Sequence, residues 1–139
     1  MADFWIKPLM AVNRLALRLS GGRLGSRMAG QDVLLLETRG RKTGKDYQTP
    51  INYYRDGEDY VVVASNWGKH NHPGWYFNLK DCPAAAILLR GQRIPVIARD
   101  ASGAEYQRLW KQVTGRNPFY TQYQQQTDRQ IPLVVLTRQ

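Results

Sequence analysis

The chain has 139 residues, of which 42% are hydrophobic and 22% charged, which suits one domain over residues 1–139 with a closed core and excludes general disorder. The single cysteine, Cys82, excludes an intrachain disulfide and a cysteine-based metal cluster, and it favours the reducing cytoplasm. The formal net charge of +9 predicts anionic partners, which include phosphates, polycarboxylates, nucleic acid and anionic lipid.

Residues 1–22 are expected to form an amphipathic basic helix that begins near Pro8 and ends at Gly21-Gly22. One side carries Trp5, Leu9, Val12, Ala16 and Leu19, and the opposite side carries Lys7, Arg14 and Arg18. These charges interrupt the apolar residues, which excludes a signal peptide and a membrane span. Three placements stay open for the helix: packed on the barrel, lying on the inner face of the cell membrane, or covering a ligand pocket.

From residue 32 to 139, short apolar runs divided by turn residues predict strands. The expected strands are Val33–Thr38, Gln48–Tyr54, Tyr60–Ala64, Ala86–Arg90, Arg93–Arg99 and Leu133–Thr137. Asp56-Gly57 predicts a hairpin that makes the second and third strands antiparallel neighbours, and Gly91-Gln92 predicts another between the fourth and fifth. Pro95 places part of the fifth strand at an edge or a bulge.

Three helices are expected between and after these strands. They run over about residues 73–80, 102–114 and 117–127. Pro73 suits a first turn, Ser102 and Glu105 predict a capping box, and Asn117 before Pro118 predicts an N-cap. About six mainly antiparallel strands with peripheral helices indicate an α+β domain whose sheet closes as a barrel.

The turn Gly40-Arg41-Lys42-Thr43-Gly44-Lys45 lies between two expected strands and combines cationic side chains, a hydroxyl and flexible backbone amides. Such a turn is suited to binding phosphate or carboxylate. It is not a Walker A loop, because the glycine spacing is one residue short, no Ser or Thr follows Lys45, and a strand comes next. A solvated hairpin tip is the alternative interpretation.

This turn is the first of several short sequence motifs that follow one another along the rest of the chain. They are Gly40-Arg-Lys-Thr-Gly44, Pro50, Val62-Val-Ala-Ser65, Pro73-x-Trp75-Tyr76-x-Asn78-Leu79 and Thr127-Asp-Arg129-x-Ile131-Pro132. In this order and spacing, the chain resembles the deazaflavin (F420)-dependent nitroreductase family from about Val33 onward. The resemblance implies an FMN-binding-like split β-barrel and an oxidoreductase that transfers a hydride from reduced F420 to a quinone, a nitroaromatic or an activated alkene.

The same resemblance assigns the cofactor residues. The turn residues Arg41, Lys42, Thr43 and Gly44 are expected to hold the phosphate and polyglutamate tail. Many relatives carry an arginine between the second glycine and the proline, and here either Lys45 takes its place or the affinity for the tail is lower. The residues expected to border the deazaflavin ring are Thr49, Pro50, Ile51, Asn52, Ala64, Ser65, Asn66, Trp67, Gly68 and Trp75. Trp75 suits the hydrophobic core equally well.

Hydroxyl groups are the candidates for chemistry on the acceptor. Ser65, Tyr120 or Tyr123 is expected to hydrogen-bond the acceptor or deliver a proton, and packing of a helix face is the alternative for both tyrosines. Asn117 stands where some relatives have a tyrosine, so the acceptor stays open. His70 and His72 indicate a surface loop, and no metal is assigned.

Two other functions stay open at this stage. One is a split barrel loaded with FMN or haem instead of F420. The other is a basic, non-enzymatic module for anionic lipid or nucleic acid, although scattered cations and the lack of a recognised motif argue against nucleic acid. A homodimer also stays open, as does peripheral membrane contact through the first helix.

Overall fold

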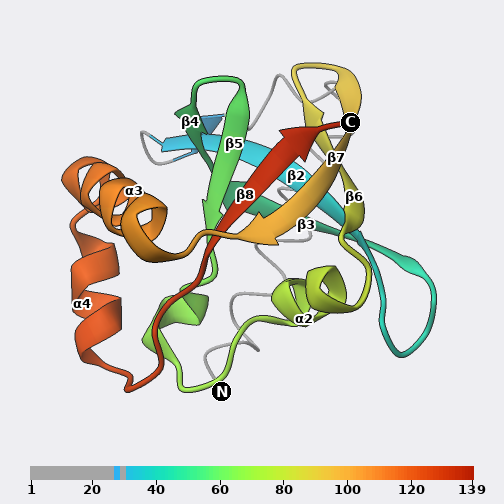
Figure 1. Ribbon diagram of the computed structural model, residues 1–139. Helices are drawn as coiled ribbons and strands as arrows, with labels where there is room; N and C mark the ends of the chain where they lie inside the picture. The colour runs from blue at the N-terminus through green and yellow to red at the C-terminus, as the bar shows by residue number, and fades with distance from the viewer. Residues whose placement is uncertain (1–26, 29–30) are drawn as a thin grey trace.

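The computed structural model describes residues 27, 28 and 31–139, which form a curled antiparallel half-barrel with helices packed against it (Figure 1). The expected helix over residues 1–22 lies outside the described residues. The strands are β1 (Arg27–Met28), β2 (Gln31–Arg39), β3 (Asp46–Asn52), β4 (Tyr54–Asp56), β5 (Asp59–Val63), β6 (Ala84–Leu89), β7 (Gln92–Asp100) and β8 (Leu133–Arg138). The helices are the 3-10 turn η1 (Asn66–Gly68), α2 (Gly74–Asp81), α3 (Gly103–Arg116) and α4 (Phe119–Gln125).

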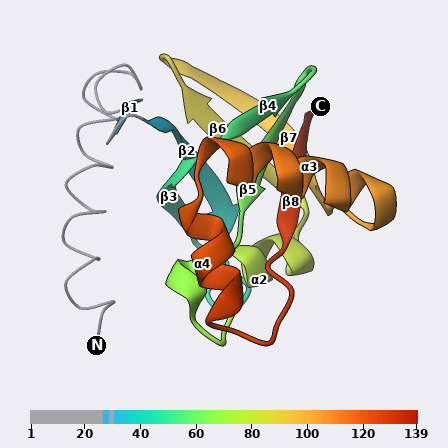
Figure 2. The ribbon, with the colours of Figure 1, turned by 90° about the vertical axis from the view of Figure 1, so that its left-hand side faces the viewer.

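The expected α+β split barrel is confirmed. The sheet order is β1-β2-β6-β7-β8-β5-β4, and β3 pairs with β2, all antiparallel. Strands β5 and β8 are apolar over Tyr60–Val63 and Leu133–Leu136, where both of their faces are buried. Val62 and Val134 face the barrel interior, which α2 also fills, whereas Val61 and Val135 face α3 and α4. Figure 2 shows α3 and α4 together in front of this outer face.

The second expected strand, Gln48–Tyr54, is two strands. The strand partner changes at Tyr53. The N–H of Tyr53 bonds to the carbonyl of Asp32 in β2, whereas Tyr54 pairs with Val61 of β5. Successive tyrosines therefore enter different core clusters, Tyr53 inside the barrel and Tyr54 beneath the outer helices. Both expected hairpins form. Pro95 pairs with Ala86 of β6, whereas the pairing of β7 with β8 begins one residue later, at Val96, so Pro95 lies on an edge of the sheet on that side.

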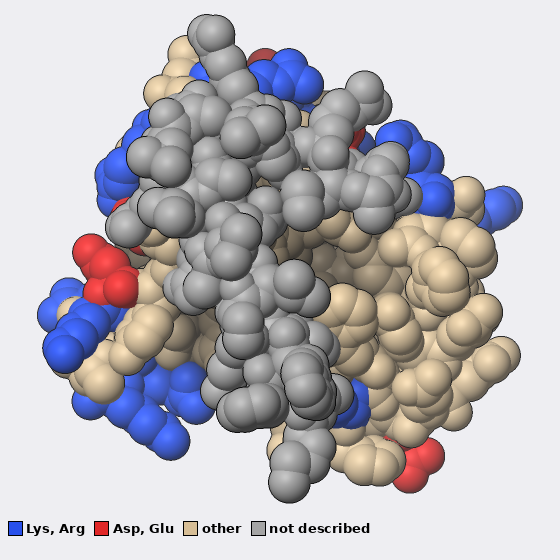
Figure 3. Space-filling view, turned by 180° about the vertical axis from the view of Figure 1, so that it is seen from behind, with Lys and Arg blue, Asp and Glu red and all other residues tan. Residues whose placement is uncertain are grey.

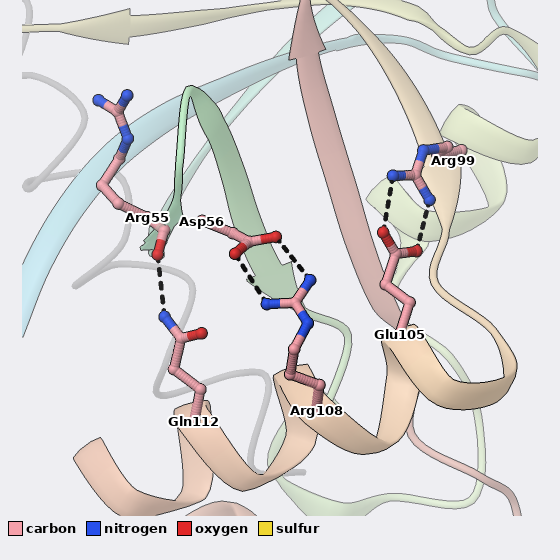
Figure 4. Close-up of polar contacts among 6 residues, drawn as sticks. All are labelled: Arg55, Asp56, Arg99, Glu105, Arg108 and Gln112. Carbon is pink, nitrogen blue, oxygen red and sulfur yellow. Dashed lines mark hydrogen bonds and ion pairs between the residues drawn. The ribbon is translucent and has the colours of Figure 1, made fainter.

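The expected capping box of α3 is wrong, because Ser102 makes no side-chain capping bond. Glu105 instead binds Arg99 of β7 through two hydrogen bonds of 2.6 and 2.9 Å (Figure 4). This bidentate, charge-assisted pair occupies both carboxylate oxygens of Glu105. Arg108 binds Asp56 in the same way, at 2.9 and 3.0 Å, so α3 is fixed to both β7 and the β4–β5 hairpin.

The other expected helices form with shifted ends. Asn117 caps α4 as expected, since its Oδ1 accepts the N–H of Phe119 at 3.1 Å, and the helix ends at Gln125. None of the helices within residues 31–139 has the length and apolar character needed to cross a membrane.

Candidate functional site

A cavity of about 770 Å³ opens between the β2–β3 hairpin, the segment after β5 and the start of α2. It is lined by Thr38, Gly40, Arg41, Lys42, Thr43, Tyr47, Gln48, Thr49, Pro50, Asn66, Trp67, Lys69, Asn71, His72, Pro73, Gly74, Trp75 and Asn78. The volume suits a small organic ligand or cofactor. Its wall combines cationic groups from the hairpin with aromatic rings from η1 and α2.

The β2–β3 hairpin tip is a tight turn of defined shape. The N–H of Gly40 bonds to the carbonyl of Lys45 at 2.7 Å, and the N–H of Gly44 bonds back to Gly40 at 2.8 Å. Gly44 has φ 72°, a left-handed conformation that glycine adopts without strain. The hydroxyl of Thr43 accepts the N–H of Lys45 and contacts the hydroxyl of Tyr47 at 3.0 Å. This tip therefore presents its cations from a fixed backbone.

Asn78 of α2 holds this tip against the cavity. Its Oδ1 accepts the backbone N–H of Arg41 at 3.2 Å and the guanidinium Nη1 at 3.0 Å. Its Nδ2 donates to the hydroxyl of Thr38, so the buried amide is satisfied on both sides. The guanidinium of Arg41 also donates to the carbonyl of Gly74 and lies over the ring of Phe77.

The cavity wall is positively charged. Arg41, Lys42 and Lys69 line it, and no aspartate or glutamate is among its described lining residues. Lys42 has no ion pair or hydrogen bond with the described part of the chain, and the nearby carboxylate of Glu37 is bound by Arg93 at 2.7 Å. The cavity thus favours an anionic ligand. Elsewhere, lysine and arginine lie scattered around the periphery of the face shown in Figure 3.

The structure places about half of the expected cofactor residues in the cavity wall. Those that line it are Arg41, Lys42, Thr43, Thr49, Pro50, Asn66, Trp67 and Trp75. Those that do not are Gly44, Lys45, Ile51, Asn52, Ala64, Ser65 and Gly68, each of which lies within two residues of a lining residue in the chain. Trp75 serves both roles that its sequence suggested, because it lines the cavity and is also 9% exposed within the barrel core.

The three expected hydroxyl groups lie in different surroundings. Tyr120 is buried, and its hydroxyl accepts a hydrogen bond from Tyr54 at 3.1 Å. Burial and this bond raise the pKa of Tyr54 above its usual value. The ring of Tyr123 lies edge-on to the cavity-lining Trp67, with 6.3 Å between centroids. Ser65 directly precedes η1. None of the three is among the residues that line the cavity in the described structure.

Sequence reasoning missed several polar residues of the wall. They are Thr38, Tyr47, Gln48, Lys69, Asn71, His72 and Asn78. A signal existed for Asn78, because it is a polar residue one turn from Trp75 on the apolar face of a short helix. His72 was assigned to a surface loop, but its ring packs on Tyr76 and Phe77 at 4.7 and 5.6 Å. No sequence signal predicted that packing.

Comparison with known proteins identifies relatives along almost the whole chain. The sequence profile of the F420H(2)-dependent quinone reductase family matches residues 10–138. An F420H(2)-dependent quinone reductase of Mycobacterium tuberculosis is 41% identical over 143 aligned positions, which cover 96% of each chain. A second relative from that organism is 39% identical over 75% of this chain and 87% of its own length.

Solved structures give the same grouping. The structure of an F420-H2 dependent reductase, FDR-A, is 34% identical with a TM-score of 0.69, covering 75% of this chain and 92% of that one. A structure described as a domain-swapped dimer is 28% identical with a TM-score of 0.73, covering 98% and 99%. The haem storage protein HutZ of Vibrio cholerae shares the fold alone, at 18% identity and a TM-score of 0.54 over 77% and 81%. With a family profile that spans nearly all of it, this chain belongs to the F420H(2)-dependent quinone reductase family.

Proposed function

We propose that this protein is an F420H2-dependent reductase that transfers a hydride to a small organic acceptor of the quinone type. The observation that carries the proposal is the cavity beneath the β2–β3 hairpin, whose described wall holds Arg41, Lys42 and Lys69 without a carboxylate. A polyanionic phosphate and glutamate tail suits such a wall, because its anionic oxygens meet cationic side chains and no carboxylate among the described lining residues. Membership of the family supports the choice of cofactor.

The residues of the cavity fit both parts of the cofactor. Arg41, Lys42 and Thr43, helped by Gly44 and Lys45, would hold the tail at the hairpin tip. Further along the wall, Thr49, Pro50, Trp67 and Trp75 present apolar and aromatic surface of the kind that packs on a planar ring. Ile51, Asn52, Ala64, Asn66 and Gly68 complete the proposed ring-side set in the same two segments.

The chain's own contribution to the reaction is binding, orientation and proton supply. When bound, reduced F420 supplies the hydride. We assign the proton or hydrogen bond that the acceptor needs to a hydroxyl of Ser65, Tyr120 or Tyr123. The contact of Tyr123 with Trp67 favours Tyr123, whereas the hydroxyl of Tyr120 is engaged by Tyr54.

A binding titration tests the proposal directly. The purified protein is titrated with F420, with a deazaflavin that lacks the phosphate and glutamate tail, and with FMN, followed by fluorescence. Tight binding of F420, much weaker binding of the tail-less compound, and turnover of F420H2 with a soluble quinone are the expected results. Equal affinity for both deazaflavins would show that the cationic tip does not bind the tail. Higher affinity for FMN would show that FMN, and not F420, is the cofactor.

Assembly and membrane contact belong to the same proposal. A homodimer is supported by the structural relative described as a domain-swapped dimer, and it is checked by light scattering. Peripheral contact of residues 1–22 with an anionic membrane is checked by co-sedimentation with vesicles at low and high salt.

A further inference from the structure

The segment that carries Trp67 into the cavity wall has an unusual backbone. Asn66, Trp67 and Gly68 have φ values of 48°, 60° and 77°, which is a run of three left-handed residues. For Trp67 this conformation costs about 1–2 kcal/mol, because the Cβ crowds the following carbonyl, whereas asparagine adopts it more readily. Such a turn persists only where its surroundings hold it in place.

Arg129, in the loop between α4 and β8, contacts both ends of this turn. Its Nη1 donates to the carbonyl of Ala64 at 3.1 Å, and its Nη2 donates to the carbonyl of Ser65 at 2.7 Å. Its Nε donates to the carbonyl of Lys69 at 2.9 Å. The guanidinium therefore joins the residues before the turn to the residue after it. A planar fork of donors suits this arrangement, and a single ammonium does not.

The same guanidinium sets the protonation of a histidine in the cavity wall. Nη1 of Arg129 lies 3.0 Å from Nδ1 of His72. Because a guanidinium only donates, Nδ1 must accept, and the ring proton must sit on Nε2. Burial, and then the charge of Arg129, lower the pKa of His72, which favours this neutral form.

Arg129 has no carboxylate partner among residues 31–139. Its acceptors in the described structure are three carbonyl oxygens and the histidine nitrogen. Its N–H groups thus bind the backbone carbonyls of Ala64, Ser65 and Lys69, in the segment that contains the left-handed turn, and do not form an ion pair. A role in shaping that segment explains this better than a general contribution of charge to stability.

We propose that Arg129 is the positioning residue of the candidate site: it ties Ala64, Ser65 and Lys69 across the left-handed turn and fixes His72 with its proton on Nε2. It thereby sets where Trp67 and His72 stand in the cavity wall. What this wall binds rests on the proposed function, but the positioning itself does not.

The test compares Arg129→Lys, which keeps the charge and loses the fork, with Arg108→Lys. The control also loses a bidentate Arg contact, but on the outer face of α3. Arg129→Lys should raise the Kd for F420 at least about tenfold, since misplaced binding groups are costly, whereas Arg108→Lys leaves it unchanged. Nitrogen NMR of the cofactor-free protein should show the Nε2-protonated form of His72 in the wild type and in Arg108→Lys, and a mixture of forms in Arg129→Lys.

Wild-type behaviour of Arg129→Lys in both measurements would overturn the proposal, because charge alone would then suffice. If the wild type binds no F420 but the NMR change occurs, the proposed function fails and the positioning role stands. Should Arg129→Lys not fold, Arg129→Ala is studied with added guanidinium, which should restore the His72 signal while methylammonium does not. Equal rescue by both cations, or rescue by neither, overturns the proposal.

Discussion

The side-chain oxygen of Asn78 accepts two hydrogen bonds from Arg41, one from its backbone N–H at 3.2 Å and one from its guanidinium at 3.0 Å. The amide therefore anchors the hairpin tip to α2 without adding a negative charge. An aspartate could make the same contacts but would neutralise the arginine. The tip is held in place, and its charge remains available to an anionic ligand.

Two substitutions of Asn78 separate anchoring from charge. Asn78→Ala leaves Arg41 and Thr38 without a buried partner and should lower the free energy of unfolding by about 1–3 kcal/mol, together with F420 affinity. Asn78→Asp keeps the oxygen that accepts from Arg41, and the Thr38 hydroxyl can donate to the second carboxylate oxygen. Its free energy of unfolding should therefore lie closer to that of the wild type, but its affinity for F420 should be low. Urea unfolding and cofactor titration give the two values. Wild-type affinity in Asn78→Asp would show that the charge of Arg41 is unimportant.

Lys42 is expected to act through its charge alone. Lys42→Gln should leave the unfolding free energy unchanged, because the side chain has no partner in the described structure. Its Kd for F420 should rise about three- to tenfold, as for one charge-assisted contact. The matched control, Lys111→Gln, makes the same change of net charge on the exposed side of α3. A similar rise in both variants would point to the overall field of the protein and not to the hairpin tip.

Gly68 is required by its conformation and by close packing. A Cβ at this position would lie 3.0 Å from Cα of Tyr123, and φ is 77°. Gly57 also has a positive φ, of 61°, but a Cβ there meets open space. Gly57→Ala should cost about 1 kcal/mol from strain alone, and Gly68→Ala should cost about 2–4 kcal/mol because α4 must also shift. Urea unfolding measures both, and equal costs would contradict the close approach of α4.

His72 makes stability sensitive to mild acid. Burial, Arg129 and Lys80 lower its pKa, and Asp100 opposes them, while its ring rests on Tyr76. The unfolded chain, whose histidine titrates near pH 6.5, therefore binds this proton more readily than the folded protein. Stability contributed by neutral His72 is present at higher pH and declines as the pH falls below about 6.5.

The variant His72→Asn isolates this effect, since asparagine keeps an acceptor for Arg129 and does not titrate. The unfolding free energy is measured at about pH 8 and about pH 5.5. The wild type should lose more stability over this interval than the variant. An equal loss would mean that the proton affinity of His72 does not change on folding.

Two helix starts provide a further test. Ser102→Ala should change the unfolding free energy by less than about 0.5 kcal/mol, because Ser102 makes no capping bond. Asn117→Ala should cost about 1 kcal/mol or more through the lost bond to the N–H of Phe119. Thermal unfolding followed by circular dichroism compares the two variants. A large loss of stability in Ser102→Ala would show that Ser102 caps α3 after all.

Local sequence was enough to predict most of the strands and helices of this protein. Short apolar runs, the Asp56-Gly57 turn and the Asn117 cap predicted strands, hairpin and helix correctly, because each depends on neighbours in the chain. The cationic turn at Gly40–Lys45 was also visible, since its chemistry lies within one contiguous segment. The break at Tyr53 was missed, because it marks a change of strand partner and not a change of residue type.

What only the tertiary structure decided is which distant groups meet. Glu105 could cap its own helix, but folding places Arg99 of β7 2.6 Å from its carboxylate, and Glu105 pairs with Arg99 instead. Arg129 lies 65 residues from Ala64 and Asn78 lies 37 from Arg41, yet both shape the cavity. Short-range propensity carries no information about such pairs, whose geometry is set by how the sheet curls. The sequence determined the pieces of the site and its charge, whereas the curl of the barrel determined which side chains hold them in place.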